Sequence, residues 1–340
     1  MSDKKISKSE YLDFIEEKFK VCFNEKGYIE ELAVNVTSKI DPTVDFIGSN
    51  ISPLKKYLET ENYGDVGRYI VQECMKFKSF KYLQTNVPQK FGCYYRGMGI
   101  IAKPELERIV KDTFDYLTDE KYLHISPENL CIRVSSTDED LIKATENVDS
   151  KITRLVDQSS IEHYRHRYGM DEKNIFGRDF NIGLKKKGTN EFLNFASFVV
   201  MENNERKLAV DMGISNLALS MCKFGTSSTV SSSRIADFLD IDSIMKEKFA
   251  DALVAVAILL KEDVTNHSSK HLRMKFRQYL RVLNYWNEQL QYPNEDVVNL
   301  IINYLGAEYH SSFEQKKDEF YKVLTLQKNI ENSLLYNINK

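Results

Sequence analysis

The chain has 340 residues, of which 42% are hydrophobic and 29% charged, an ordinary composition for a globular protein with room for two domains. Its formal net charge of -3 and pI near 6.2 argue against a protein that binds polyanions over its whole surface, so any nucleic-acid contact must come from a local patch. The five cysteines contain no CxxC pair, which argues against a disulfide framework and a zinc knuckle. No run of about 18 apolar residues occurs, and we expect a cytosolic protein without a membrane segment.

The first half of the chain alternates helical and strand patterns. Residues 10–23 carry apolar side chains at helical spacing, and residues 104–117 repeat this pattern behind a proline in the first turn. Residues 130–134 are typical of a strand, and Thr137-Asp138-Glu139-Asp140 predicts a capped helix start. These segments indicate a scaffold and carry no chemistry by themselves.

The stretch from 191 to 220 combines two strands, a turn and a helix around one acidic residue. Residues 192–201 predict a strand, residues 202–206 a hairpin tip, and residues 208–210 the returning strand. We expect Asp211 to end this strand, and Gly213 to supply the backbone freedom for a sharp turn into the helix. A carboxylate there can hold the ammonium group of a ligand, or it can cap the following helix.

The last third of the chain is helical in pattern. Residues 224–233 are small and polar and predict a linker, after which residues 251–261 predict a buried helix and residues 269–287 an amphipathic one. Further helices are expected at 296–305 and 313–335. The amphipathic helix carries basic residues at spacings that give a stripe able to follow phosphates, or an exposed face paired with glutamates: Lys270, Arg273, Lys275, Arg277 and Arg281.

Two other short motifs carry weaker signals. His163 and His166 lie one helical turn apart, but no acidic or cysteine partner stands at ligand spacing, so a solvated or phosphate-facing surface is favoured over a metal site. The Gly97-x-Gly99 pattern has no third glycine, so it is a weak signal for a phosphate-binding loop. The two tyrosines before it are also typical of ordinary packing within a sheet. No metal site is predicted.

The central stretch resembles alanyl-tRNA synthetase, a class II aminoacyl-tRNA synthetase. Val199-Val200-Met201-Glu202 followed by Val210-Asp211-Met212-Gly213 is similar to the family's val-phe-met-glu strand, hairpin and val-asp-thr-gly strand. The resemblance implies that Val199 and Gly213 line the amino-acid site and that Asp211 holds the α-amino group. The family's ATP-binding arginine is replaced by Ala218.

Earlier motifs are similar to the same family. Asp-Pro-Thr at 41–43 precedes a turn in which Ile51 replaces the family's pocket methionine, and the resemblance implies a site for a small side chain. Lys76 replaces the family's arginine that contacts the substrate carboxylate and the α-phosphate. Lysine lacks the planar guanidinium group that forms bidentate hydrogen bonds. Tyr94 or Tyr95 is implied to stack on adenine, with Arg96 near a position where the family is acidic. The basic helix, with Lys270, Arg273, Arg277 and Arg281, resembles the arginine-rich helix of the tRNA-recognition domain.

The resemblance implies an α+β fold, in which a class II synthetase-type antiparallel sheet flanked by helices precedes an all-α domain. It places a catalytic domain at 1–225, a linker at 226–236 and a helical tRNA-recognition-like domain at 237–340. The implied activity is ATP- and Mg²⁺-dependent activation of a small amino acid such as alanine and its transfer to a tRNA acceptor stem or another acceptor, without zinc. The alternative is a catalytically inactive pseudo-synthetase that binds an amino acid, tRNA or a protein partner.

Overall fold

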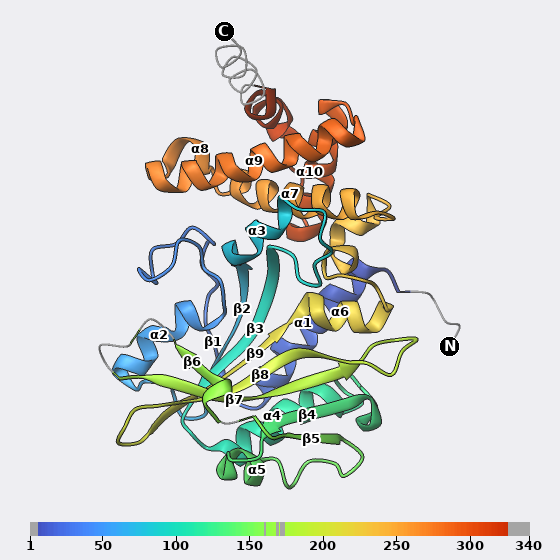
Figure 1. The fold of residues 1–340 in the computed structure, drawn as a ribbon. Helices are drawn as coiled ribbons and strands as arrows, with labels where there is room; N and C mark the ends of the chain where they lie inside the picture. Colours follow the sequence, from blue (N-terminus) through green and yellow to red (C-terminus); the bar gives the residue numbers. More distant parts are fainter. Residues whose placement is uncertain (1–5, 160, 168–169, 171–173, 326–340) are drawn as a thin grey trace. The chain divides into compact units, whose positions relative to one another are not determined.

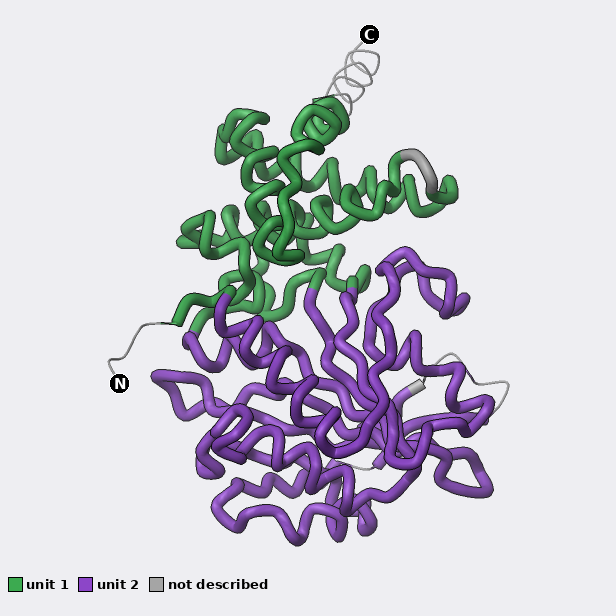
Figure 2. The backbone as a smooth tube through the Cα atoms, turned by 180° about the vertical axis from the view of Figure 1, so that it is seen from behind, with its two compact units in different colours: residues 1–9, 75–94, 226–340 green, residues 10–74, 95–225 purple. Residues whose placement is uncertain are grey.

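The computed structural model describes residues 6–159, 161–167, 170 and 174–325 (Figure 1). The chain forms two compact units, and each unit is built from segments that are not contiguous in sequence (Figure 2). One unit contains residues 1–9, 75–94 and 226–340, and the other contains residues 10–74 and 95–225. We call them the helical unit and the sheet unit.

Among the described residues, nine strands form a single sheet in the order β1-β2-β3-β9-β8-β7-β4-β5, with β6 also paired to β7. The run from β3 through β9, β8 and β7 to β4 is antiparallel, whereas β1–β2 and β4–β5 at the two edges are parallel. The strands are β1 Ile29–Glu30, β2 Arg68–Met75, β3 Tyr94–Ala102, β4 Leu130–Ser135, β5 Thr153–Asp157, β6 Arg165–Arg167, β7 Phe176–Lys185, β8 Phe192–Glu202 and β9 Lys207–Ser215.

One face of the sheet is apolar because alternate side chains of a strand point to the same side. Its buried residues are Met98, Ile100, Phe180, Phe198, Met212 and Ile214. Helices α1 (Lys8–Glu25) and α4 (Leu106–Thr118) cover this face, since the hydroxyl of Tyr116 donates to the carbonyl of Ile15 at 2.9 Å and lies 3.9 Å from the sulfur of Met98.

The opposite face carries three glycines, Gly97, Gly99 and Gly213, where β3 and β9 pair. We call it the glycine face. Helix α2 (Ile51–Thr60) packs over one end of it, in a buried cluster that joins Ile51 to Ile101 and Met201. The small residues leave space above the strands, and the side chain of Asn50 lies in it.

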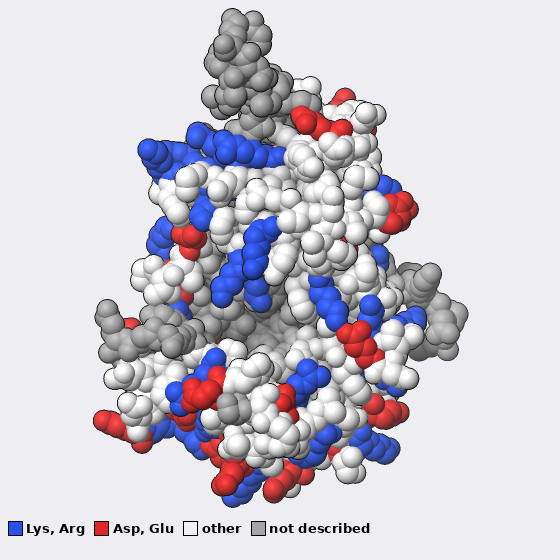
Figure 3. Space-filling model, viewed as in Figure 1, with Lys and Arg blue, Asp and Glu red and all other residues white. Residues whose placement is uncertain are grey.

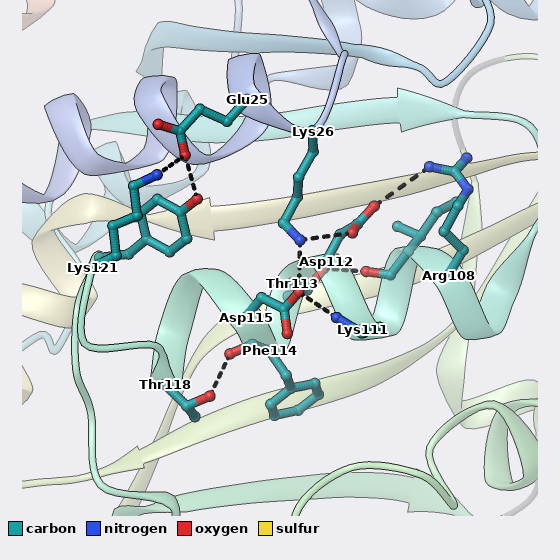
Figure 4. Close-up of polar contacts among 12 residues, drawn as sticks. Glu25, Lys26, Arg108, Lys111, Asp112, Thr113, Phe114, Asp115, Thr118 and Lys121 are labelled. Carbon is teal, nitrogen blue, oxygen red and sulfur yellow. Dashed lines mark hydrogen bonds and ion pairs between the residues drawn. The ribbon is translucent and has the colours of Figure 1, made fainter.

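An ion-pair network joins the end of α1 to α4 (Figure 4). Lys26 Nζ lies 3.0 Å from Asp112 and 2.6 Å from Asp115, and Asp112 also accepts from Tyr28 and pairs with Arg108. Burial lowers the pKa of Lys26, but hydrogen bonds to the two aspartates outweigh it and raise the pKa. The network fixes the two helices that support the sheet from its apolar side.

The helical unit is built on three long helices, α7 (Ile244–Lys261), α9 (Lys270–Leu290) and α10 (Asn294–Tyr309). The segment 75–94 belongs to this unit, and its short helices η1 (Phe77–Ser79) and α3 (Phe80–Leu83) pack on α9. The rings of Phe80 and Tyr279 lie 5.1 Å apart, and Trp286 Nε1 donates to the carbonyl of Leu83 at 2.8 Å. The shorter helices of the chain are η2 Pro127–Asn129, α5 Glu139–Ala144, η3 Ile161–Tyr164, α6 Asn216–Phe224, η5 Val230–Ser232, η6 Arg234–Asp237, α8 Val264–His267 and η7 Glu314–Lys316.

The α+β fold expected from the sequence, an antiparallel sheet with flanking helices followed by a helical region, is confirmed. Residues 226–236, which the sequence analysis assigns to a linker, contain the short helices η5 and η6. Their hydroxyl groups bond to one another and to the backbone: Ser232 donates to the carbonyl of Ser228 at 3.0 Å and is fully buried. Of the helix expected at 313–335, residues 326–335 lie outside the described residues. Within the described residues, no helix combines the length and the apolarity that crossing a membrane requires.

Candidate functional site

Asp211 lies inside strand β9, not at its end as the sequence analysis expected. The strand continues through Gly213 to Ser215, and it is Ser215 that caps α6, accepting from the amide of Ala218 at 3.3 Å. Gly213 therefore makes no turn. A Cβ added there would lie 2.8 Å from Asn50 Oδ1, so the glycine is needed for a close approach.

Two carboxylates flank a valine on the glycine face. The strand register pairs Asp179 with Val199 and Val199 with Asp211 across β7, β8 and β9. Because directly paired residues of antiparallel strands share a face, Asp179 and Asp211 point to the same side, about 10 Å apart at Cα. Both side chains are buried.

Asn50 lies over the glycines and bonds to Asp211. Its Nδ2 donates to Asp211 Oδ1 at 3.2 Å. A Cβ on Gly99 would lie 2.0 Å from the same Nδ2, so this glycine has no room for a side chain. Asn50 stands at the N-cap of α2 but makes no cap hydrogen bond with its side chain, which is used for Asp211 instead.

The charge of Asp211 is poorly compensated. Burial raises its pKa to about 7, against the lowering effects of His166 and of the hydrogen bond from Asn50. Among the described residues, Asn50 is the one hydrogen-bond donor to this carboxyl group. A cationic ligand would bring a positive charge into direct contact with this carboxylate.

His166 brings a titratable base to the same face. Strand β6 pairs with β7 so that His166 lies opposite Gly177, two residues from Asp179. His166 Nε2 lies 3.1 Å from Asp179 Oδ2, and this hydrogen bond raises the pKa of the imidazole against the opposing effect of burial. Its side chain is 41% exposed. In the part of the chain that the structure describes, no group of three or more metal-ligating side chains is found.

The two tyrosines of β3 point to opposite faces. Tyr95 alternates with Gly97 and lies on the glycine face, where its hydroxyl donates to the carbonyl of Gly48 at 3.1 Å. Tyr94 belongs to the helical unit, and its hydroxyl donates to Glu308 at 2.8 Å. Arg96 lies on the apolar side, paired with Glu16 at 2.9 Å and Glu73 at 3.6 Å. Of these three residues, only Tyr95 shares the glycine face with Asp211.

The remaining candidates of the sequence analysis lie in different surroundings. Ile51 begins α2 and is buried in the cluster with Ile101. Val199 separates the two carboxylates, and Ala218 is fully buried in α6. Lys76 is exposed and belongs to the helical unit, where its backbone amide donates to the carbonyl of Cys93 at 2.7 Å.

Basic side chains gather along α9 (Figure 3). Lys270, Arg277 and Arg281 are exposed, and Arg273 is half-buried with a hydrogen bond to the carbonyl of Ser268 at 2.6 Å. Between residues 264 and 287 the sequence has five lysines and arginines and no aspartate or glutamate. The apolar side of α9 is buried by Phe276 and Tyr279, so the basic side chains lie on its outer face.

Asn50, Asp179 and the His166–Asp179 pair were missed by the sequence analysis as parts of one site. A signal existed for Asp179, since an aspartate inside a strand pattern that continues into Phe180 and Ile182 is unusual. For Asn50 none existed, because its partner is 161 residues away.

Comparison with known proteins gives weak structural similarity only. No family model matches the sequence, and no curated protein matches it. Similar solved structures include a proposed threonyl-tRNA synthetase from Aeropyrum pernix, with TM-score 0.41 and 10% identity over 74% of this chain and 70% of that one. A pyrrolysyl-tRNA synthetase from Desulfitobacterium hafniense has TM-score 0.38 and 12% identity over 65% and 71%, and an aspartyl-tRNA synthetase from Entamoeba histolytica has 0.39 and 10% over 66% and 57%. At such values the similarity does not assign this chain to a family.

Proposed function

We propose that this chain is a class II synthetase-like ligase that activates a small amino acid such as alanine with ATP and passes it to tRNA or another acceptor. The observation that carries the proposal is Asp211, a carboxylate on the glycine face of an antiparallel sheet, with a pKa raised to about 7 by burial and a single amide donor among the described residues. The ammonium group of an amino acid supplies the missing charge. The resemblance of the 199–213 stretch to alanyl-tRNA synthetase supports the same role.

In this proposal, the sheet unit binds the amino acid. Asp211 holds the ammonium group, Val199 and Gly213 lie beside it, and Tyr95 is the tyrosine placed to stack on adenine. Tyr94 and Arg96 are less suited, since both side chains point to the other face of the sheet, where Arg96 is paired with glutamates.

ATP and Mg²⁺ are the expected cofactors, because attack on the α-phosphate develops charge that a metal ion neutralises. The described residues do not assemble a donor set for Mg²⁺, and Ala218 cannot contact a phosphate.

Amino-acid-dependent exchange of pyrophosphate into ATP tests the ligase. Wild-type protein should exchange label with alanine, or with another small amino acid, and Asp211→Asn should lose this exchange. Arg206→Ala, at an exposed ion pair with Glu61, serves as the matched control and should retain it.

A catalytically inactive pseudo-synthetase is the second candidate, and a specific observation favours it. Arg96 follows directly after Tyr94 and Tyr95, the two candidates for stacking on adenine. It is engaged by Glu16 and Glu73 and does not replace the cation missing at Ala218. Exchange absent with every amino acid, together with retained binding of alanine or of tRNA, would support this candidate over the ligase.

For the helical unit we propose tRNA binding through Lys270, Arg273, Arg277 and Arg281. The acid-free run of α9 supports this, because phosphate contacts need a local excess of positive charge in a chain that is acidic overall. The domain limits at 225 and 237 and the cytosolic location remain predictions.

A further inference from the structure

The glycine face holds a charged pair that the proposed function has not used. His166 and Asp179 form an ion pair at 3.1 Å, and they share the face and the strand register with Asp211.

We infer that His166 is the cationic residue that binds the carboxylate of the amino acid whose ammonium group is held by Asp211. The inference rests on the proposed amino-acid binding and names a further specificity-determining residue for it. The ligand class is an α-amino acid in its zwitterionic form, with a free carboxylate.

The strand register gives the geometry. Asp179, Val199 and Asp211 form one row, and the paired position of His166 opposite Gly177 sets the imidazole beside the Asp179 end of that row. The ion pair of His166 with Asp179 therefore lies at one end of the row and the carboxylate of Asp211 at the other, with the side chain of Val199 between them. An α-amino acid carries its two charges on groups attached to the same carbon atom, so it can span such a pair over a short distance.

The electrostatics agree with this arrangement. The hydrogen bond from Asp179 raises the pKa of the imidazole and so favours its protonated form, and the charge of Asp211 adds to this effect. His166 in turn lowers the pKa of Asp211, so the two groups are within electrostatic reach of one another. The imidazole remains 41% exposed, whereas Asp179 is buried, so an incoming carboxylate meets the cation and not the aspartate behind it.

Asp179 is a positioning residue in this scheme. It orients His166 and holds its charge, as a carboxylate does for a histidine in many binding sites. Asn50 orients Asp211 in a similar way. It donates a hydrogen bond to Oδ1, and we assign Oδ2 to the ligand.

Calorimetric titration with ligands that lack one charge tests the inference. The full-length protein is titrated at pH 7 with L-alanine, with L-alaninol, which keeps the ammonium group but has no carboxylate, and with propionate, which has only the carboxylate. Wild-type protein should bind alanine about tenfold to a hundredfold more tightly than alaninol, the usual effect of one hydrogen bond to a charged group. His166→Gln should lower alanine affinity to the alaninol level and leave alaninol unchanged.

Three further variants make the result specific. His166→Lys, which keeps the charge, should restore most of the preference for alanine over alaninol. His163→Gln is the matched control, since His163 is exposed in η3 and should change neither affinity. Asp211→Asn should weaken alanine and alaninol equally and leave propionate unchanged.

Two outcomes would overturn the inference while leaving the proposed function intact. One is an unchanged alanine-to-alaninol ratio in His166→Gln, and the other is an equal loss of both ligands in that variant with an unchanged thermal melt. Wild-type protein that binds neither alanine nor alaninol would instead overturn the proposed function, and the inference with it.

Discussion

Asn50 Nδ2 donates to Asp211 Oδ1 at 3.2 Å and lies where a side chain on Gly99 would be. The asparagine, the aspartate and the glycine therefore depend on one another for space as well as for hydrogen bonding. A residue at a helix N-cap normally bonds to the helix amides, and here it serves a strand instead.

Replacement of Gly99 by alanine should be costly because its Cβ would lie 2.0 Å from Asn50 Nδ2. We expect a loss of about 1–3 kcal/mol in the free energy of unfolding, measured by urea denaturation. Gly97→Ala, whose Cβ would be 3.3 Å from Asn50 Oδ1, should cost less.

A double-mutant cycle identifies the cause. In an Asn50→Ala background, Gly99→Ala should lose most of its effect, with an interaction free energy of about 1 kcal/mol or more. Additive effects of the two substitutions would show that Asn50 does not limit the space at Gly99.

Asp211 should make stability depend on pH. Folding raises its pKa from 3.8 to about 7, so between these values the folded state keeps a proton that the unfolded state releases. Stability therefore falls as pH rises through this window and levels off above about pH 7. Asp211→Asn removes the titration.

The measurement is urea denaturation of wild-type protein and Asp211→Asn at several pH values from 4 to 8. The variant should gain stability relative to wild type as pH rises, by up to about 4 kcal/mol in total. A difference that stays constant over the range would mean that Asp211 keeps an ordinary pKa in the folded state.

Arg178 should be important for the stability of the sheet unit. It is buried on β7 and bonds to Asp138, to Asp140 at 2.6 Å and to Glu202 at 2.9 Å. Arg178→Met leaves these carboxylates without their shared cation, and we expect a loss of about 3–5 kcal/mol in the free energy of unfolding.

The matched control for this prediction is Arg206→Ala, at the exposed pair with Glu61. It should cost no more than about 1 kcal/mol. Similar losses in the two variants would show that the cluster around Arg178 is no more important than a surface ion pair.

The basic stripe on α9 should bind nucleic acid in a salt-dependent way. Joint replacement of Arg273, Arg277 and Arg281 by alanine should weaken tRNA binding and reduce the slope of log affinity against log salt by about three, since each arginine neutralises about one phosphate. Affinity is measured by fluorescence anisotropy between about 50 and 200 mM salt.

A control variant removes the same charge elsewhere. Lys20, Lys39 and Lys111 are exposed in the sheet unit, and their joint replacement by alanine should leave affinity and salt slope nearly unchanged. Binding that survives the arginine substitutions, or falls equally in both triple variants, would argue against the stripe.

Periodicity was enough to predict the main elements. The strand at 192–201 and the basic helix at 269–287 correspond to β8 and α9, because alternation and helical spacing are local properties. Asp211 was found from the same local pattern, although its strand is longer than expected. Its surroundings were not predictable, since Asn50 and His166 reach the glycine face only through long-range pairing.

The surroundings of Arg96 were not predictable either. The resemblance made it a candidate cofactor-binding residue, and one step along a strand moves a side chain to the other face of the sheet. It lies opposite to Tyr95 and pairs with Glu16 from α1, a partner 80 residues earlier in the chain. The face of a residue follows from its register, and the register of β3 with β9 is fixed by contacts that the sequence does not reveal.

Residues 75–94 belong to the helical unit although they lie between two segments of the sheet unit, and this limits how the protein can be truncated. A fragment that starts at residue 226 encodes all three long helices, yet it omits Phe80 and Leu83, which cover Tyr279 and Trp286 on α9. Such a fragment would display an aromatic surface to water and would tend to aggregate. Conversely, the sheet unit cannot be expressed by simple truncation, because the polypeptide crosses from one unit to the other four times, at 9/10, 74/75, 94/95 and 225/226.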